Sequence, residues 1–317
     1  MKVIGIENVF RTHPLPGLSN FKVVTWEDKV EIDSADIYIQ ANIMECKHRK
    51  LRPMYQYIKD SGKPWIVAES AVFRKNMKAP PNPMAYHRYS WFSYFRDEGL
   101  YNNQNRPSDR WDQIQRDQNI EVKDWRNEGD YVLVALQRPG DSSLKNLLAK
   151  YKTYENFLAS ILKDIRKNTK RPIRLRMHPL RRDRQEEIFK KLNLEGVTIS
   201  DNTEGAKIAG GGEGGSGLQK DFAGAWCVVG FNSNVLTESI CEGIPTFSLC
   251  PSSMAWECSN TNLADLDNPK FFDRQQWLYN LGYCQWREDE IAQGAPYHHL
   301  MEIYDQAKMY IQNGQLR

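Results

Sequence analysis

Short apolar runs alternate with helix-like segments through the second half of the chain, and this rhythm constrains the fold more than any other feature. The runs lie at residues 131–136, 172–177, 197–200, 225–230 and 246–249. Amphipathic segments at residues 147–168, 182–192 and 235–242 separate them. Short buried strands joined by amphipathic helices form βαβ units, in which the strands run parallel. We therefore predict a parallel sheet covered by helices.

The first third of the chain repeats the rhythm. Strand-like runs lie at residues 2–6, 21–25, 37–40 and 65–67, and a helix-like segment at 43–61 precedes the last of them. Residues 76–128 interrupt the pattern with Pro, Asn, Arg and aromatic residues, as a cover or linker between domains would. A length of 317 residues suits two domains. The predicted fold is α/β, with Rossmann-like domains at 1–128 and 129–317 facing a cleft and the C-terminal helices packing back.

Composition narrows the setting of the protein. The six cysteines are scattered without a C-x-x-C pair, so we expect neither a disulfide framework nor a structural zinc site. No apolar run reaches the roughly 20 residues that span a bilayer, and the first residues lack the pattern of a secretory signal. We expect a soluble, cytoplasmic protein without a membrane span.

Charge alone does not predict a partner. The chain has 43 basic and 40 acidic residues, a formal charge of +3, which is too small to indicate nucleic-acid binding. Basic and aromatic residues gather at 86–126, and basic residues again at 163–184. These segments are compatible with local positive faces and equally with ordinary solvated surface.

Polar residues follow the run at 225–230, where a strand should lead into a helix. A helix N-terminus has free backbone N–H groups and a positive dipole end, which together bind anions. Asn232, Ser233 and Asn234 add side-chain donors there, and Glu238 lies one helical turn later, where it could reach sugar hydroxyls. Ordinary N-capping by Asn or Ser is the alternative explanation.

Two further strand ends carry polar residues. Arg174 and Arg176 alternate along one strand, so both point to one face, and His178 continues that face at the strand's end. Arginine and histidine are charged donors to phosphate oxygens, although a lone histidine is more often structural. In the third turn, Gln137 is followed by residues that can cap the next helix; they are Asp141, Ser142 and Ser143. Three such turns at carboxyl strand ends predict a nucleotide crevice.

Other chemistry finds little support in the sequence. The chain has no G-x-S-x-G elbow, no H-E-x-x-H, no Walker lysine motif and no G-x-G-x-x-G after the first strand. His298 and His299 lack partners at metal-ligand spacing, so we expect surface or packing roles for them and no metal site. The glycine-rich stretch 210–217 is typical of a mobile loop or linker, and we exclude it from the site.

Several of these segments resemble a known group of enzymes. The second half resembles the nucleotide-binding half of GT-B glycosyltransferases, especially the capsule-type group with Kdo transferases and the related teichoic-acid glycerophosphotransferases. The matching segments are 132–137 with 141–143, 176–179, and 232–234 with Glu238 and 243–245. The resemblance implies a GT-B-like fold and implies that His178, Ser233 and Asn234 hold the phosphate of the donor.

A second resemblance concerns the acceptor. Residues 277–291 and 88–91 are similar to segments of small phage-encoded glycosyltransferases, some of which modify hydroxymethylated pyrimidines of phage DNA. This implies 5-hydroxymethylpyrimidine in double-stranded DNA as the acceptor, with the aromatic and basic stretch 86–126 stacking on a flipped base. A capsule or surface polysaccharide acceptor is the first alternative. A non-catalytic nucleotide- or carbohydrate-binding protein of the same fold is the second.

The predicted activity is transfer of a sugar from a nucleotide-sugar donor, UDP- or CMP-linked, to an acceptor hydroxyl, without a cofactor. Donor-binding residues are predicted to be Gln137, Asp141, Ser142, Ser143, Arg176, His178, Asn232, Ser233, Asn234 and Glu238. An inverting reaction needs a general base from the first domain. Glu69 is the first candidate because it ends a strand, and His87 and Asp97 follow.

Overall fold

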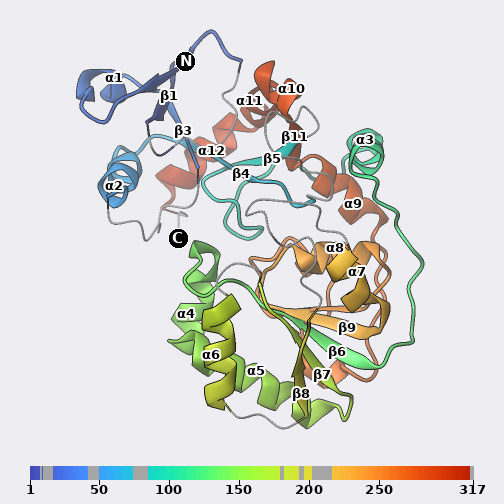
Figure 1. The fold of residues 1–317 in the computed structure, drawn as a ribbon. Helices are drawn as coiled ribbons and strands as arrows, with labels where there is room; N and C mark the ends of the chain where they lie inside the picture. The colour runs from blue at the N-terminus through green and yellow to red at the C-terminus, as the bar shows by residue number, and fades with distance from the viewer. Residues whose placement is uncertain are drawn as a thin grey trace. The chain divides into compact units, whose positions relative to one another are not determined.

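The computed structural model describes residues 1–7, 9, 17–41, 50–73, 85–178, 182–192, 196–201 and 216–314 (Figure 1). The chain divides into two compact units. Unit 1 comprises Met1–Val72, Pro80–Asp112 and Leu278–Arg317, and unit 2 comprises Phe73–Ala79 and Gln113–Trp277. The predicted boundary lay at residue 128, whereas here the N-terminal part of unit 1 ends at Asp112. The C-terminal residues from Leu278 also group with the N-terminal strands.

Unit 1 contains a six-stranded sheet of order β11-β5-β4-β3-β1-β2. The parallel part consists of β1 (Val3–Ile6), β2 (Phe21–Val24), β3 (Ile37–Ala41) and β4 (Trp65–Ser70), which match the four predicted strands. Two antiparallel strands, β5 (Tyr86–Trp91) and β11 (Gln285–Arg287), extend it. Strand β5 lies in the stretch that the sequence analysis assigned to a cover or linker, so that assignment was wrong for these residues.

Helices complete unit 1 around this sheet. They are α1 (Lys29–Asp33), α2 (Arg52–Asp60), α10 (Glu288–Ala292), α11 (Ala295–Met301) and α12 (Tyr304–Gln312), while α3 (Asp109–Gln118) spans the division between the units. The buried side chains of Tyr297 and Leu300 belong to the same apolar core as those of β1, β3 and β4. The indole N–H of Trp91 donates to the Leu300 carbonyl at 3.1 Å. These contacts explain why the C-terminal helices belong to unit 1.

Unit 2 contains a five-stranded parallel sheet of order β10-β9-β6-β7-β8. Its strands are β6 (Tyr131–Ala135), β7 (Ile173–Arg176), β8 (Val197–Ile199), β9 (Ala225–Gly230) and β10 (Thr246–Ser248), which confirms the five predicted runs. The chain starts in the middle, adds β7 and β8 on one side, and then adds β9 and β10 on the other. This is the Rossmann-like order, and it changes direction between β6 and β9.

Helices cover both faces of the unit 2 sheet. They are α4 (Lys145–Tyr151), α5 (Tyr154–Asn168), α6 (Arg182–Leu192), α7 (Ser216–Ala223) and α8 (Val235–Cys241), with α9 (Gln275–Gly282) at the division between the units. Figure 1 shows α5 and α6 on one face of this sheet and α7 and α8 on the other, as right-handed crossovers require. The single helix predicted at 147–168 is broken at Lys152, whose φ of 67° stops α4. No helix in the described part of the chain is long and apolar enough to cross a membrane.

Candidate functional site

The loops that follow β6 and β9 meet where the strand order of unit 2 changes direction. Gln137 Nε2 donates to Asn232 Oδ1 at 2.8 Å and to Ser143 Oγ at 3.0 Å. In return, the Asn232 backbone N–H donates to Gln137 Oε1 at 3.3 Å, and Asn232 Nδ2 donates to the Ser143 carbonyl at 3.0 Å. The structure therefore brings three predicted donor-binding residues into one hydrogen-bonded cluster, which we call the Gln137–Asn232 cluster (Gln137, Ser143 and Asn232).

The loop after β6 is fixed by capping and by a buried tyrosine. Asp141 accepts from the Ser143 N–H at 3.0 Å and pairs with Arg138 at 2.8 Å, so it caps the 3₁₀ turn Ser142–Leu144. The Tyr154 hydroxyl donates to the Gln137 carbonyl at 2.8 Å, and burial raises the pKa of Tyr154, which keeps this donor protonated. Asp141 therefore has the capping role that the sequence analysis left open, and Ser142 begins the turn, half-buried.

The loop after β9 leads into α8. Ser233 Oγ accepts from the Val235 N–H at 3.3 Å, and Asn234 occupies the N-cap position of α8. The Asn234 carbonyl accepts from the Thr237 hydroxyl at 2.6 Å and from the Glu238 N–H at 3.2 Å. Ser233, Asn234 and Glu238 are all half-buried. This loop thus carries the predicted polar side chains next to the Gln137–Asn232 cluster, in the order that the sequence indicated.

The end of β7 differs from this pattern. Arg176 forms an ion pair with the fully buried carboxylate of Asp221 on α7, and it also donates to the Gly217 carbonyl at 3.2 Å. Asp221 in turn accepts two contacts from the Ser200 hydroxyl, at 2.7 and 2.8 Å. Arg174 lies on the same face, 3.9 Å from the ring of Tyr131, as the period of two predicts. Arg176 is therefore directed to α7 and is not part of the Gln137–Asn232 cluster.

His178 follows β7 with a half-buried side chain. Its backbone N–H donates to Gln185 Oε1 at 3.0 Å, and Gln185 Nε2 donates to its carbonyl at 2.9 Å. Gln185 is buried on α6, so it fixes the backbone of His178 from both sides. Pro179, the second residue of the predicted His-Pro pair, lies outside the described residues, as do residues 210–215 of the glycine-rich stretch.

A fourth strand end with polar residues, that of β10, was missed by the sequence analysis. Asn146 Nδ2 donates to Ser252 Oγ at 2.7 Å, and Ser252 is buried in the turn after β10. The Ser248 hydroxyl donates to the Phe231 carbonyl at 3.3 Å, which links β10 to the loop after β9. Pro251, Ser252 and Ser253 follow an apolar run, so the rule that identified the other turns would have identified this one.

The three candidate bases do not lie together in unit 1. Glu69, half-buried near the end of β4, accepts from the Ser70 N–H through Oε1 at 2.8 Å. Glu69 lies opposite Arg88 on β5, whereas His87 lies opposite Ser70, so the side chains of Glu69 and His87 point to opposite faces of the sheet. His87 is buried, 3.6 Å from Glu288, whose pKa is raised by burial. Asp97 is exposed in a turn after β5.

Most aromatic rings of the stretch 86–126 lie in the interior. Tyr86, Tyr89, Trp91 and Trp111 are buried. Arg110 is buried as well, and its guanidinium donates to both carboxylate oxygens of Glu290, at 2.8 and 3.1 Å. These rings and this charge are not available to stack on a base or to pair with a phosphate, which removes much of the sequence argument for a DNA surface here.

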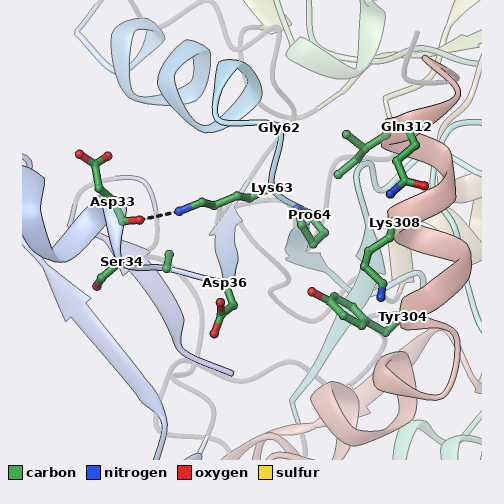
Figure 2. Close-up of a pocket in the computed structure, with 11 residues that line it drawn as sticks. Asp33, Ser34, Asp36, Gly62, Lys63, Pro64, Tyr304, Lys308 and Gln312 are labelled. Atoms are coloured by element: carbon green, nitrogen blue, oxygen red, sulfur yellow. Dashed lines mark hydrogen bonds between the residues drawn. The ribbon is translucent and has the colours of Figure 1, made fainter.

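A cavity of about 430 Å³ lies within unit 1 and is drawn in Figure 2. It opens beside Asp36 and Pro64, the residues before β3 and β4, which is the edge opposite the carboxyl ends of these strands. Its charged groups already have partners, since Lys63 Nζ donates to the Asp33 carbonyl at 2.5 Å and Asp36 accepts from the Lys2 N–H at 2.6 Å. We assign it no part in the chemistry. Within the described ranges, no group of three or more His, Cys, Asp or Glu residues could hold a metal ion.

Comparisons with known proteins add a similarity of fold. No family model and no curated protein matches the sequence. Among solved structures, the KpsC β-Kdo 2,4 transferase of Thermosulfurimonas dismutans matches with a TM-score of 0.53 and 13% identity, over 95% of this chain and 98% of that chain. The KpsC β-Kdo 2,7 transferase of the same organism gives a TM-score of 0.47 and 11% identity, over 94% and 99% of the two chains.

AviGT4, a glycosyltransferase involved in avilamycin A biosynthesis, gives a TM-score of only 0.28 and 13% identity, over 99% and 98% of the chains. Only the β-Kdo 2,4 transferase, among these three, exceeds a TM-score of 0.5, and at 13% identity it shows a likeness of fold. Together with the two sheets, this likeness confirms the predicted class: an α/β, GT-B-like fold of two Rossmann-like units.

Proposed function

We propose that the chain is a glycosyltransferase whose nucleotide-sugar donor binds to unit 2 at the Gln137–Asn232 cluster. The observation that carries the proposal is the pairing of Gln137 with Asn232 at 2.8 Å, at the point where the strand order changes direction. In open α/β sheets, this crevice outside the carboxyl strand ends is where nucleotides bind. The loops after β6 and β9 converge on this hydrogen-bonded pair at that point of the sheet.

The neighbouring polar residues have roles in this proposal. His178 and Ser233 donate to the phosphate oxygens of the donor, as does Asn234, because charged and polar donors at strand ends suit an oxyanion. Glu238 accepts from sugar hydroxyls. Arg176 does not contact the donor in this proposal; its ion pair with Asp221 holds the end of β7 against α7. Asp141 and Ser142 shape the loop that carries Ser143.

The reaction follows from these roles. An acceptor hydroxyl attacks the anomeric carbon of the donor sugar while the bond from that carbon to the phosphate oxygen breaks. The hydroxyl proton passes to the Glu69 carboxylate, and the nucleotide leaves with the electron pair of the broken bond. The donors of unit 2 stabilise the negative charge of the departing phosphate, and no metal ion is required for this step.

We favour a sugar hydroxyl of a surface polysaccharide as the acceptor, because the solved structure with the TM-score of 0.53 is a β-Kdo 2,4 transferase. Most aromatic rings of the stretch expected to stack on a flipped pyrimidine are buried, which weakens the case for 5-hydroxymethylpyrimidine in DNA. DNA is therefore the second acceptor to be tested.

The first experiment tests the donor site. UDP and CMP are screened for thermal stabilisation of the whole chain, because a ligand that binds only the folded state raises the melting temperature. At least one of them should stabilise the wild-type protein. Failure of both would reject the donor site. Binding without hydrolysis or transfer to any acceptor would instead favour the non-catalytic alternative.

The second experiment tests the base. Transfer is measured with the stabilising nucleotide's sugar donors on polysaccharide acceptors and on hydroxymethylated DNA, using wild type, Glu69→Gln and the control Glu27→Gln. Glu27 is an exposed glutamate of the same unit. Loss of a general base typically costs about 10²- to 10⁴-fold in rate, so Glu69→Gln should lose that much and Glu27→Gln should not. Full activity of Glu69→Gln would remove Glu69 from the mechanism.

A further inference from the structure

Arg88 on β5 is a buried arginine that makes no ion pair within the described part of the chain. The residue is only 5% exposed, and its Nε atom has no hydrogen-bond partner. Its guanidinium lies 5.2 Å from the centre of the Tyr94 ring, and its charge also acts on Tyr101, where it opposes the rise that burial causes in the pKa of that phenol. A guanidinium is a cation, so this position holds a positive charge.

Arg110, in the same unit, shows what a satisfied buried arginine looks like. It is 8% exposed, and it bonds to both oxygens of Glu290, to the Gln285 carbonyl at 2.8 Å and to the Gly282 carbonyl at 3.3 Å. Burying a charge without such partners is strongly unfavourable, and arginine is rarely buried unless paired. In the described part of the chain, Arg88 has no comparable set of carboxylate and carbonyl partners.

Gln40 on β3 gives a second, independent observation. It is fully buried, and neither its Nε2 nor its Oε1 has a hydrogen-bond partner. Gln40 lies opposite Val67, and Glu69, two residues further along β4, lies opposite Arg88. Because side chains alternate between faces along a strand, Gln40, Glu69 and Arg88 share one face of the sheet. An unsatisfied amide and an unpaired guanidinium thus flank the candidate base.

We propose that Arg88 and Gln40 bind an oxyanion, a carboxylate or a phosphate group, on the acceptor, and that they thereby present a neighbouring hydroxyl to Glu69. This inference rests on the proposed function, in which the acceptor binds beside Glu69 in unit 1. A guanidinium binds planar oxyanions through two parallel N–H bonds, and the amide supplies one more donor and one acceptor. The three residues lie toward the carboxyl ends of β3 and β4, where open α/β sheets bind ligands.

The test uses acetate and inorganic phosphate as probes of the two oxyanion classes. Melting temperatures of the whole chain are measured in each salt against sodium chloride of equal ionic strength, for wild type, Arg88→Gln and the control Arg52→Gln. Arg52 is an exposed arginine of α2 in the same unit. Acetate, phosphate or both should stabilise the wild type and Arg52→Gln more than Arg88→Gln, and the effective salt identifies the class of group.

Affinity gives the magnitude of the effect. Losing one member of a buried charge pair weakens binding by on the order of 30-fold or more, so the concentration of the effective anion needed for half of the shift should rise by at least that factor in Arg88→Gln. Equal stabilisation of wild type and Arg88→Gln by both anions would overturn the proposal, because any anion bound in unit 2 would stabilise all three proteins alike.

Stability without ligand separates this role from a structural one. Removing an unpaired buried charge should leave the melting temperature in chloride unchanged or higher in Arg88→Gln, whereas Arg110→Gln should lower it by breaking a satisfied pair. A fall in Arg88→Gln as large as that in Arg110→Gln would assign Arg88 to the core and overturn the proposal.

Failure of this inference can be told from failure of the proposed function. Shifts produced by UDP or CMP depend on residues of unit 2, so they should be the same in wild type and Arg88→Gln. If neither nucleotide stabilises the wild type, the proposed function is rejected. The comparison of wild type with Arg88→Gln in acetate and phosphate then still tests the anion site independently. If a nucleotide binds and the anion effect at Arg88 is absent, only the acceptor site is rejected.

Discussion

Gln137 and Asn232 are joined by two hydrogen bonds across the middle of the unit 2 sheet. The Gln137 amide donates to Asn232 Oδ1 at 2.8 Å, and the Asn232 backbone N–H donates back to Gln137 Oε1 at 3.3 Å. The two residues are separated by 95 positions in the chain, and they follow β6 and β9, between which the strand order changes direction. A nucleotide bound at this point of the sheet would therefore contact both loops, which these hydrogen bonds already hold together.

Asn232→Ala should weaken nucleotide binding and lower stability. The substitution removes the two hydrogen bonds of the Asn232 side chain, from Gln137 Nε2 and to the Ser143 carbonyl, and keeps the bond from the backbone N–H to Gln137 Oε1. A lost buried hydrogen bond costs about 1 to 3 kcal/mol, so affinity for the stabilising nucleotide should fall about tenfold or more. Isothermal titration calorimetry measures this. Asn268→Ala, at an exposed asparagine of the same unit, is the control, and an equal affinity for both variants would contradict the prediction.

Asp221→Ala should be among the most destabilising single changes in unit 2. The Asp221 carboxylate is fully buried, pairs with Arg176 and accepts from the Ser200 hydroxyl, so its removal leaves a cation and a hydroxyl unsatisfied. Breaking such a pair typically costs about 3 to 5 kcal/mol in the free energy of unfolding, measured by urea denaturation. Glu187→Ala breaks the exposed pair with Lys191 and should change little. Similar urea midpoints for the two variants would refute this.

The strands of unit 2 and the polar residues after them could be predicted from the sequence because both signals are local. An apolar run of four to six residues followed by Asn, Ser or Gln needs no distant information. The role of Arg176 could not be predicted in this way, since its partner Asp221 is 45 residues further along the chain. Alternation placed Arg174 and Arg176 on one face, but which helix covers that face depends on the crossover that returns from β8 to β9.

Unit 1 was harder to predict for physical reasons. Strand β5 is buried along its whole length, yet its sequence includes His87, Arg88 and Ser90, so it has no apolar pattern to recognise. The place of the C-terminal helices depends on contacts such as the Trp91 bond to Leu300, across 209 positions. The segments that follow β3 and β4, at 42–49 and 74–84, lie outside the described residues.

His299 should make stability fall in mild acid. Burial lowers the pKa of His299, more than its hydrogen bond to the Asn102 carbonyl raises it. In the unfolded chain, the histidine pKa is near 6.5, so below that pH the unfolded chain binds a proton more readily than the folded chain does. The free energy of unfolding is therefore highest above about pH 6.5 and falls as the pH drops below it. Glu302 lies 3.9 Å from the ring and favours its charged form, which reduces the effect without reversing it.

The measurement is the free energy of unfolding at pH 7.5 and pH 5.5. The loss between these pH values should be smaller in His299→Gln than in wild type, because glutamine has no proton to gain. His298→Gln changes the exposed neighbour and should behave like wild type. A wild-type pH dependence that survives in His299→Gln would assign the acid sensitivity to other groups.

Gly243→Ala should be more damaging than another glycine substitution at a similar backbone angle. Gly243 follows α8, the helix that begins beside the Gln137–Asn232 cluster, with a φ of 73°. A Cβ at this position would lie 2.0 Å from the Asp124 carbonyl oxygen, so backbone would have to move. Gly140 has a φ of 84° but nothing within 4 Å of its Cβ position. Gly140→Ala should therefore cost only the left-handed strain of about 1 to 2 kcal/mol.

The excess cost of Gly243→Ala over Gly140→Ala isolates the close approach of the two backbones. Both variants carry the same left-handed strain and the same change in unfolded-chain entropy, so these contributions cancel in the comparison. Urea denaturation should give Gly243→Ala the lower midpoint, and a shift of α8 should also weaken nucleotide binding, because Asn234 and Glu238 begin that helix. Equal midpoints would mean that the backbone at Asp124 moves aside at no cost in stability. Unchanged nucleotide affinity would mean that a shift at the end of α8 does not reach its first residues.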